Sequence, residues 1–187
     1  MKNFKYSRKC DLCKGIILHL DGDRKYSRRA FNYYNSLKLN AVVENIPENK
    51  QEYVVIDLLN KYRPDILIIT GHDLMYKRGQ KFYDMDNYKN SKYFVNTVKR
   101  ARKWNRSEED LVIFAGACES FYEAIMAEGA NFASSPGRIM IDYMDPLIVA
   151  SKVAQTDNNN YITIKEISPF LKNGMVGIGG TKAIGKC

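Results

Sequence analysis

The stretch Leu111-Val112-Ile113-Phe114-Ala115-Gly116-Ala117-Cys118-Glu119-Ser120 decides the fold of this 187-residue chain. Its four large apolar residues in a row are typical of a strand that is buried on both faces, as in a parallel sheet. Three small residues then turn the backbone and present Cys118 at the carboxyl end of that strand. Ser120 and Glu123 have the Ser-x-x-Glu spacing of a capping box, so we expect a helix to begin there. Open α/β sheets carry their sites at such strand ends, and a helix amino terminus beside Cys118 would favour its thiolate.

A second buried strand begins at Asp65, continues through Ile66-Leu67-Ile68-Ile69 and ends at Thr70-Gly71-His72-Asp73. His72 is one of only two histidines in the chain. If the two strands are parallel neighbours, His72 and Cys118 emerge at the same edge of the sheet. A thiol and an imidazole at one edge are the minimum equipment for nucleophilic attack on an acyl carbon. The alternative is a buried structural cysteine and a loop histidine that never meet, but two strand ends that carry the pair favour the chemistry.

Apolar runs and segments of helical period alternate along the rest of the chain. We expect strands at residues 15–20, 41–43, 65–70, 111–114, 131–135 and 138–143, and helices at residues 24–37, 47–62, 91–103, 120–129, 145–153 and 163–171. This alternation predicts an α/β fold, with a mainly parallel central sheet and helices on both faces in a flavodoxin-like three-layer sandwich. We expect one main domain at residues 15–173, an amino-terminal extension at residues 1–14 and a flexible, glycine-rich tail at residues 174–187.

Composition narrows the classes of function. The net charge is +8, but the basic residues are scattered and match no nucleic-acid reader, so we expect no nucleic-acid partner. No apolar run approaches the roughly 18 residues of a membrane helix, so we expect no membrane span. Four cysteines without a regular framework indicate a reducing compartment. We interpret Cys10 and Cys13 as incidental, because no second pair completes a zinc site, and His19 as a hydrogen-bonded core histidine.

Two acids follow the first buried strand, in Asp21-Gly22-Asp23. A strand that ends in Asp-x-Asp is how haloacid-dehalogenase-type phosphatases present a nucleophile and an acid to a magnesium-bound phosphoryl group, and Thr70 could supply their hydroxyl. That scheme also needs paired carboxylates at the end of a later strand to hold the metal. Here the later strand ends at Cys118. The phosphatase is therefore kept as an alternative, beside a non-catalytic flavodoxin-like binding domain.

The two strand ends resemble those of caspase-type cysteine peptidases, a group that includes caspases, legumains, clostripain and gingipains. Their typical form is His-Gly and, further on, Glu/Gln-Ala-Cys, whereas this chain has Gly71-His72-Asp73 and Gly116-Ala117-Cys118. The resemblance implies a caspase-like version of the three-layer fold. In those enzymes the glycine after the histidine donates an oxyanion-hole amide. Because Asp73 stands in that place, the amides of Cys118, Gly71 and Asp73 are the candidate donors.

The chain is also similar to the YabG family of sporulation-specific peptidases across almost its whole length. The shared motifs are residues 18–23, 64–67, 70–73, 90–95, 114–123 and 131–136. The resemblance implies that Cys118 and His72 are the catalytic pair, and that the substrates are spore coat and cortex-lytic precursor proteins. It also implies a place in the mother-cell cytoplasm of a sporulating bacterium and in the spore coat. We expect no cofactor and no metal. YabG proteins usually carry an additional amino-terminal segment, so we expect Met1 to begin the catalytic part.

The hypothesis for the mechanism is that Cys118 attacks the scissile carbonyl as a thiolate. His72 then protonates the leaving amine and afterwards activates water. No sequence feature requires a third, orienting residue. The candidate oxyanion donors are the backbone amides named above. All of the expected catalytic groups therefore lie at the ends of the two strands.

Specificity is expected to come from an acid at the end of the first strand, because caspase-type enzymes set their P1 preference with a charge there. Either Asp21 or Asp23 would favour a cationic P1 residue. We expect Arg, whose fork pairs bidentately with a carboxylate, and we prefer Asp21, which lies nearer the strand end. The alternative is that both acids only cap the helix that follows. Further candidates for the substrate pocket, near later strand ends, are Ser134, Ser135 and Asp142.

Overall fold

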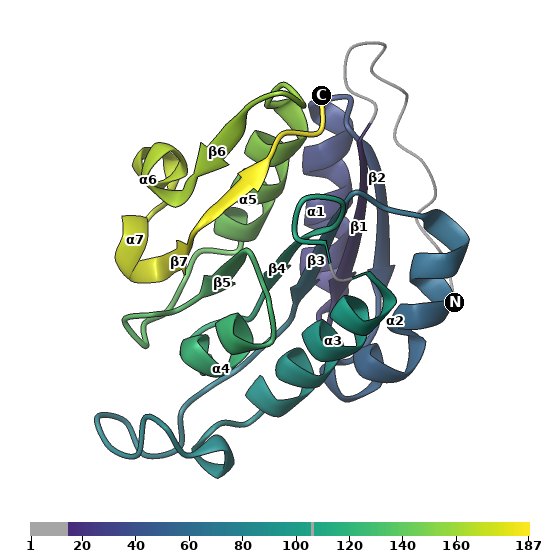
Figure 1. Ribbon diagram of the computed structural model, residues 1–187. Coiled ribbons are helices and arrows are strands. Elements are labelled where there is room, and N and C mark those ends of the chain that lie inside the picture. The colour runs from purple at the N-terminus through teal and green to yellow at the C-terminus, as the bar shows by residue number, and fades with distance from the viewer. Residues whose placement is uncertain (1–14, 106) are drawn as a thin grey trace.

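A six-stranded central sheet organises the structure, a computed structural model that describes residues 15–105 and 107–187 (Figure 1). Its strands are β1 (Ile16–Asp21), β2 (Asn40–Asn45), β3 (Ile66–Thr70), β4 (Val112–Ala115), β5 (Phe132–Ser134) and β7 (Ile178–Gly180). They lie in the order β2-β1-β3-β4-β5-β7, and each pair of neighbours is parallel except β5 and β7. A separate antiparallel pair joins β6 (Tyr161–Thr163) and β8 (Lys182–Ile184). The mainly parallel α/β sheet that the sequence predicts is confirmed.

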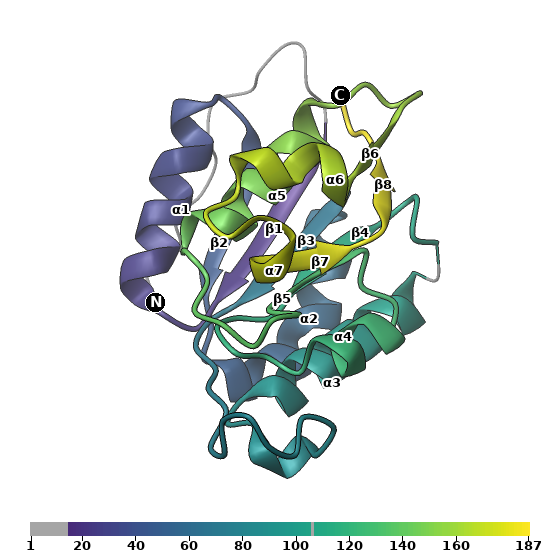
Figure 2. The same cartoon turned by 90° about the vertical axis from the view of Figure 1, so that its left-hand side faces the viewer.

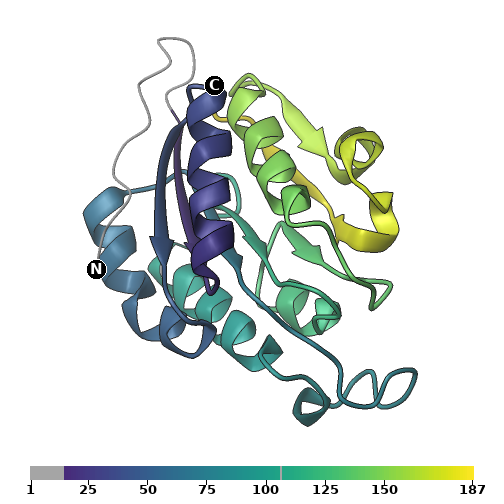
Figure 3. The same ribbon diagram turned by 180° about the vertical axis from the view of Figure 1, so that it is seen from behind.

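Helices cover both faces of this sheet (Figures 1 and 3). One face carries α1 (Arg24–Ser36) and α5 (Met144–Gln155), and the other carries α2 (Glu48–Tyr62), α3 (Ser91–Trp104) and α4 (Tyr122–Ala127). The short elements are α6 (Ile164–Ile167), α7 (Gly174–Gly177) and the 3-10 helices η1 (Met85–Asn87) and η2 (Ser168–Phe170). Within residues 15–105 and 107–187, no helix is both long enough and apolar enough to cross a membrane.

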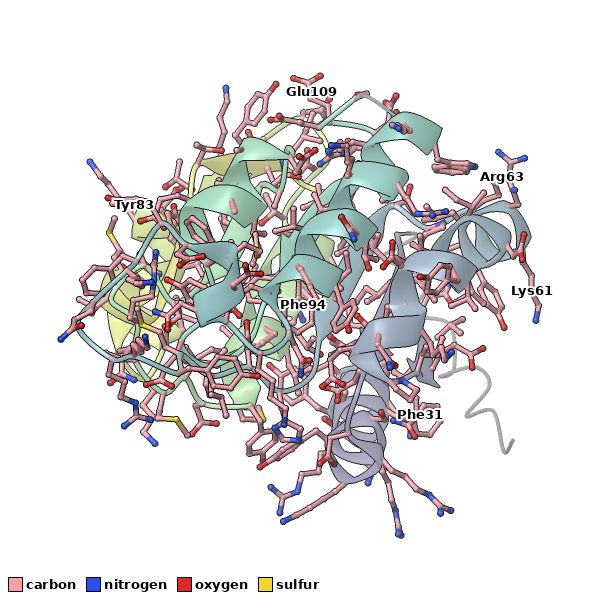
Figure 4. The ribbon with its side chains drawn as sticks, turned by 90° about the horizontal axis from the view of Figure 1, so that it is seen from below. Phe31, Lys61, Arg63, Tyr83, Phe94 and Glu109 are labelled. Atoms are coloured by element: carbon pink, nitrogen blue, oxygen red, sulfur yellow. The ribbon has the colours of Figure 1, made fainter. Side chains whose placement is uncertain are left out.

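The core is divided in two by the sheet, because successive strand residues point to opposite faces. In β3, Ile66 and Ile68 belong to the apolar cluster under α1 and α5, whereas Leu67 and Ile69 belong to the cluster under α2 and α3. Phe94 of α3 lies in the second cluster, and the view from below shows it in the interior (Figure 4). A strand that feeds both clusters must be apolar at every position, which is why its sequence shows no alternation.

The carboxyl ends of β1, β3 and β4 meet at one edge of the sheet. Asp21 is level with Thr70 in the pair β1–β3, and Ile69 is level with Ala115 in the pair β3–β4. From β1 the chain passes to β2 on one side, and β3 is then added on the other side, so the strand order reverses here. Open α/β sheets form a crevice outside the carboxyl ends at such a reversal. The loops after β1, β3 and β4 are therefore the place to look for a site.

Residues 138–143 form no strand, so the prediction of a strand there is wrong. The half-buried Ile139 and Ile141 flank the exposed Met140, which imitates the alternation of a strand. The carbonyl oxygen of Ile139 accepts the amide of Glu119 (3.1 Å) instead of bonding to a neighbouring strand. The sheet position beside β5 is taken by β7, which arrives from the end of the chain (Figure 2).

The segment 174–187, which we expected to be a flexible tail, contains α7, β7 and β8. Its glycines allow close packing. A Cβ on Gly179 would lie 2.6 Å from the hydroxyl oxygen of Tyr122, and one on Gly180 would lie 2.4 Å from the carbonyl oxygen of Asn131. Gly180 also has a φ of +145°, which residues with side chains rarely adopt. The expected extension at residues 1–14, with its two cysteines, lies outside the described residues.

A buried guanidinium, that of Arg102 on α3, fixes the starts of β4 and β5. It donates to the carbonyl oxygens of Leu111 (2.7 Å) and Gly129 (2.7 Å). It also donates to the side-chain oxygen of Asn131 (2.8 Å), which in turn accepts the amide of Ile113 in β4 (2.8 Å). Burial lowers the pKa of Arg102 to about 10, so the group still carries its charge at neutral pH.

We expect Arg102→Met to lower the free energy of unfolding by about 3 kcal/mol, because it leaves several buried oxygen atoms without a donor. Urea unfolding followed by circular dichroism measures the change. The matched control is Lys99→Met on the same helix, which removes an ion pair with Glu128 (3.4 Å) between two partly exposed side chains. The control should lose less than about 1 kcal/mol. Equal losses in the two variants would contradict the anchoring role of Arg102.

Candidate functional site

A cavity of about 240 Å³ lies at the carboxyl ends of β1, β3 and β4. These strand ends contribute Asp21, His72 and Cys118 to its lining, and the irregular segment before α5 contributes Ile141 and Tyr143. The structure thus brings the thiol and the imidazole to one cavity, together with a carboxylate. All three lie where the strand order reverses, as expected for a ligand crevice.

His72 is held at its ring and at its backbone. The ring nitrogen Nε2 lies 2.9 Å from Oδ2 of Asp23. The backbone amide donates to Oε1 of Glu48 (2.7 Å), and the carbonyl oxygen accepts from the side chain of Asn90 (2.7 Å). The hydrogen bond with His72 lowers the pKa of Asp23, so this carboxylate is ionised at neutral pH and can only accept. Nε2 therefore carries the proton, which leaves Nδ1 as the nitrogen that can take one up.

The contact between Asp23 and His72 is not predicted by the sequence pattern. Oδ1 of Asp23 caps α1 by accepting the amides of Lys25 (2.7 Å) and Tyr26 (3.2 Å), as the capping alternative expected. Its other oxygen faces His72, and Asp23 is not among the residues that line the cavity. The only signal in the sequence was an acid directly before a helix. The contact itself depends on β1 lying beside β3, which the sequence does not reveal.

Asp21 is the buried acid of the cavity, with 6% of its surface exposed. Its Oδ1 accepts the amide of Asp23 (2.7 Å), and its Oδ2 accepts the hydroxyl of Thr70 (2.7 Å). The Thr70 hydroxyl also lies 2.7 Å from Nε2 of His19, whose Nδ1 lies 3.0 Å from the hydroxyl of Tyr34. His19 is 1% exposed, so its prediction as a hydrogen-bonded core histidine is confirmed. This network fixes the direction of the Asp21 carboxylate.

The thiol of Cys118 is half-buried and donates to the carbonyl oxygen of Ile141 (3.8 Å). Burial raises its pKa, so the thiol is protonated at neutral pH. The predicted help from a helix dipole is wrong, because α4 begins several residues later and is only six residues long. The predicted capping box is also wrong. Its Ser120 hydroxyl accepts the amide of Ala117 (2.9 Å) and closes the turn around Cys118 instead.

A family model described as YabG peptidase U57 matches residues 3–187. The chain belongs to this family. The resemblance to YabG that the strand-end motifs indicate is confirmed by this match. The motifs around both strand ends fall within the matched residues, and so does the whole described fold.

The sporulation-specific protease YabG of Bacillus subtilis (strain 168) is 40% identical to this YabG-family chain over 171 residues. The aligned part covers 91% of this chain and 59% of that protein, so the chain spans 59% of the length of this relative. Among solved structures, the RcsB response regulator of Salmonella typhimurium shares 11% identity with a TM-score of 0.42. That match covers 79% of this chain and 58% of the other, and a likeness at this level carries no argument about the site.

The predicted oxyanion donors of the YabG-family chain are three backbone amides. Within the described part of the chain, no other residue accepts a hydrogen bond from the amides of Gly71, Asp73 or Cys118. The amide of His72, by contrast, is bound to Glu48 (2.7 Å). A Cβ on Gly71 would lie 2.3 Å from the same Glu48 carboxylate, so a side chain here would displace the acceptor of the His72 amide. Of these three residues, Gly71 and Cys118 line the cavity and Asp73 does not.

The other predicted pocket residues do not line the cavity of the YabG-family chain. The hydroxyl of Ser134 donates to the carbonyl oxygen of Ala117 (2.8 Å), and that of Ser135 accepts a backbone amide in its own turn (2.8 Å). The carboxylate of Asp142 pairs with Lys172 (3.5 Å). Ser134 supports the turn around Cys118, and the other two support the segment that borders the cavity. All three side chains lie outside the lining of the cavity.

Proposed function

We propose that this chain is a cysteine endopeptidase that cleaves after Arg, with Cys118 as nucleophile and His72 as its base. The observation that carries the proposal is the shared cavity, which both side chains line together with the buried carboxylate of Asp21. The description of the family and the name of the Bacillus subtilis relative both point to peptide hydrolysis. The phosphatase alternative has less support, because the Thr70 hydroxyl that it needs is engaged with Asp21 and His19.

Catalysis begins with proton transfer from the Cys118 thiol to Nδ1 of His72. The transfer is needed because burial raises the pKa of the thiol, which therefore does not ionise alone at neutral pH. The thiolate attacks the carbonyl carbon, and the amide of Cys118 with that of Gly71 or Asp73 stabilises the negative oxygen. His72 then gives its proton to the leaving amine, and water activated by His72 hydrolyses the thioester.

Asp23 orients His72 in this mechanism. Its ionised carboxylate accepts the proton of Nε2 and so keeps the tautomer in which Nδ1 can act as a base. After proton transfer, the same carboxylate stabilises the imidazolium. Asp23 is therefore assigned to the histidine and not to the substrate.

Asp21 sets the preference for Arg at P1. A buried carboxylate is unfavourable unless it is well paired, and the present donors to Asp21 are an uncharged hydroxyl and an uncharged amide. A guanidinium that enters the cavity would form a charge-assisted, bidentate pair with it. Lys would offer only a point charge, which is why Arg is preferred.

The substrates proposed for this chain are proteins made during sporulation, namely spore coat proteins and cortex-lytic precursors. The support is the name of the Bacillus subtilis relative, a sporulation-specific protease, at 40% identity. With these substrates the enzyme would act in the mother-cell cytoplasm and in the spore coat.

An acyloxymethyl ketone with Arg at P1 tests the proposal directly. We expect a covalent mass gain at Cys118 in the wild type, none in Cys118→Ala, and a rate at least tenfold lower in His72→Ala, because the base is lost. The control probe carries Glu at P1 and should not react. Labelling that survives Cys118→Ala would contradict the assignment of Cys118 as the nucleophile. Equal labelling by both probes would contradict the preference for Arg at P1.

A further inference from the structure

The residue after the catalytic histidine, Asp73, has a buried carboxylate surrounded by four hydrogen-bond donors. It is 6% exposed. Oδ1 accepts the backbone amides of Leu74 (2.9 Å) and Asn90 (2.7 Å). Oδ2 accepts the hydroxyls of Ser91 (2.5 Å) and Ser120 (3.0 Å). Because all four neighbours donate, the ionised carboxylate is the form that matches them.

The two hydroxyls carry this contact on to the turn that holds Cys118. The oxygen of Ser120 accepts the amide of Ala117 (2.9 Å), directly before Cys118. The oxygen of Ser91 accepts the amide of Phe121 (2.8 Å), shortly after it. Each hydroxyl has a single proton, which goes to the carboxylate. The turn of Cys118 is thus held at both of its ends.

Asp73 is also connected directly to the loop of His72. Asp73 follows His72 in the chain, and Asn90, whose amide Asp73 holds, donates its side chain to the carbonyl oxygen of His72 (2.7 Å). One carboxylate therefore connects the loop of His72 with the turn of Cys118, although the two come from different strands. Networks of this kind fix a unique arrangement when every member is satisfied.

We propose that Asp73 is a positioning residue that keeps the His72 ring aligned with the Cys118 thiol, a role that rests on the proposed function. It accounts for an acid at the position where the caspase-type pattern has glycine. A glycine at this position can offer its backbone amide to the oxyanion, but it has no side-chain carboxylate to accept the four hydrogen bonds that Asp73 accepts. Burial raises the pKa of Asp73, and the hydrogen bonds from Ser91, Asn90, Leu74 and Ser120 oppose this effect.

The test is the pH dependence of alkylation by iodoacetamide, read at the Cys118 peptide by mass spectrometry in the full chain. In the wild type, proton transfer to His72 makes the thiol reactive at a lower pH than a lone buried thiol, and His72→Ala removes this advantage. Asp73→Asn places an amide NH2 against donors and loosens both turns. We expect it to follow the profile of His72→Ala, with reactivity at pH 6 lower on the order of a hundredfold, the effect of a misplacement of about 1 Å.

The matched control is Asp65→Asn, at the opposite end of β3, where the carboxylate of Asp65 accepts the amide of Ile16 (2.7 Å). This variant should lower the urea midpoint and keep the wild-type alkylation profile. If Asp73→Asn behaves in the same way, the positioning role is overturned. If His72→Ala changes the profile and Asp73→Asn does not, only the role of Asp73 fails. An unchanged profile in His72→Ala would instead overturn the proposed function and the inference with it.

A smaller change keeps the inference testable if Asp73→Asn does not fold. Ser120→Ala removes one of the two hydroxyls and leaves the carboxylate with three donors. We expect its profile to shift in the same direction as that of Asp73→Asn, by a smaller factor. A wild-type profile in a folded Ser120→Ala would overturn the connection between Asp73 and the Cys118 turn.

Discussion

Asp21→Asn is expected to lower kcat/KM for peptides with Arg at P1 on the order of a thousandfold. Asn has the same shape as Asp but no charge, so the guanidinium would enter a buried site without its counter-charge. The measurement compares peptides that differ only in Arg or citrulline at P1, since citrulline has the same length and a neutral end. We expect the wild type to prefer Arg strongly and Asp21→Asn to lose that preference, while cleavage of the citrulline peptide changes little.

The control for this prediction is Glu44→Gln on the neighbouring strand β2. Glu44 is as buried as Asp21, at 6% exposure, and accepts the hydroxyl of Tyr62 (3.0 Å). Because it does not line the cavity, its replacement should leave the ratio of Arg to citrulline cleavage unchanged. If Asp21→Asn keeps its preference for Arg, the specificity belongs to another group, and Asp23, the other acid that the sequence singled out, would be the next to test.

The sheet could be predicted from the sequence because its central strands are buried on both faces. Residues 66–69 and 112–114 are apolar without interruption, since their side chains feed the clusters on either side of the sheet in turn. Parallel strands end at the same edge, so the meeting of His72 and Cys118 at one cavity followed from their two strand ends. The positions of the thiol and the imidazole could therefore be predicted from the two buried strands that carry them.

Contacts between loops could not be predicted, because they depend on the order of the strands in space. Asp23 reaches His72 because β3 lies beside β1, although β2 comes between them in the sequence. In the same way, Ser91 and Ser120 both donate to Asp73, although the three residues come from different segments of the sequence. The segment 138–143 gave a wrong prediction for a related reason, since Met140, Ile141 and Tyr143 line the cavity while the carbonyl oxygens of Ile139 and Ile141 accept hydrogen bonds from the turn around Cys118. A burial pattern can be recognised in consecutive residues of the sequence. The hydrogen-bond partner of a polar side chain often comes from a distant segment and cannot be recognised in this way.

Asp23→Asn is expected to lower kcat about a hundredfold and to leave KM and stability almost unchanged. Stability is kept because Asn caps a helix as well as Asp does, and its oxygen can still accept the amides of Lys25 and Tyr26. With the oxygen committed to the cap, the amide nitrogen takes the place of Oδ2 and faces Nε2 of His72. A donor there favours the tautomer with its proton on Nδ1, which cannot accept the proton of the Cys118 thiol.

The variant Asp23→Ser separates the effect of the wrong His72 tautomer from the effect of losing the contact with His72. Ser also caps helices but is too short to reach His72, so it removes the orienting carboxylate without imposing the wrong tautomer. We therefore expect kcat to fall in the order wild type, Asp23→Ser, Asp23→Asn, measured with the Arg peptide at saturation. If Asp23 instead bound the P1 side chain, both variants would raise KM for the Arg peptide and not for the citrulline peptide. Unchanged kcat with that pattern would mean that Asp23 binds the substrate and does not orient His72.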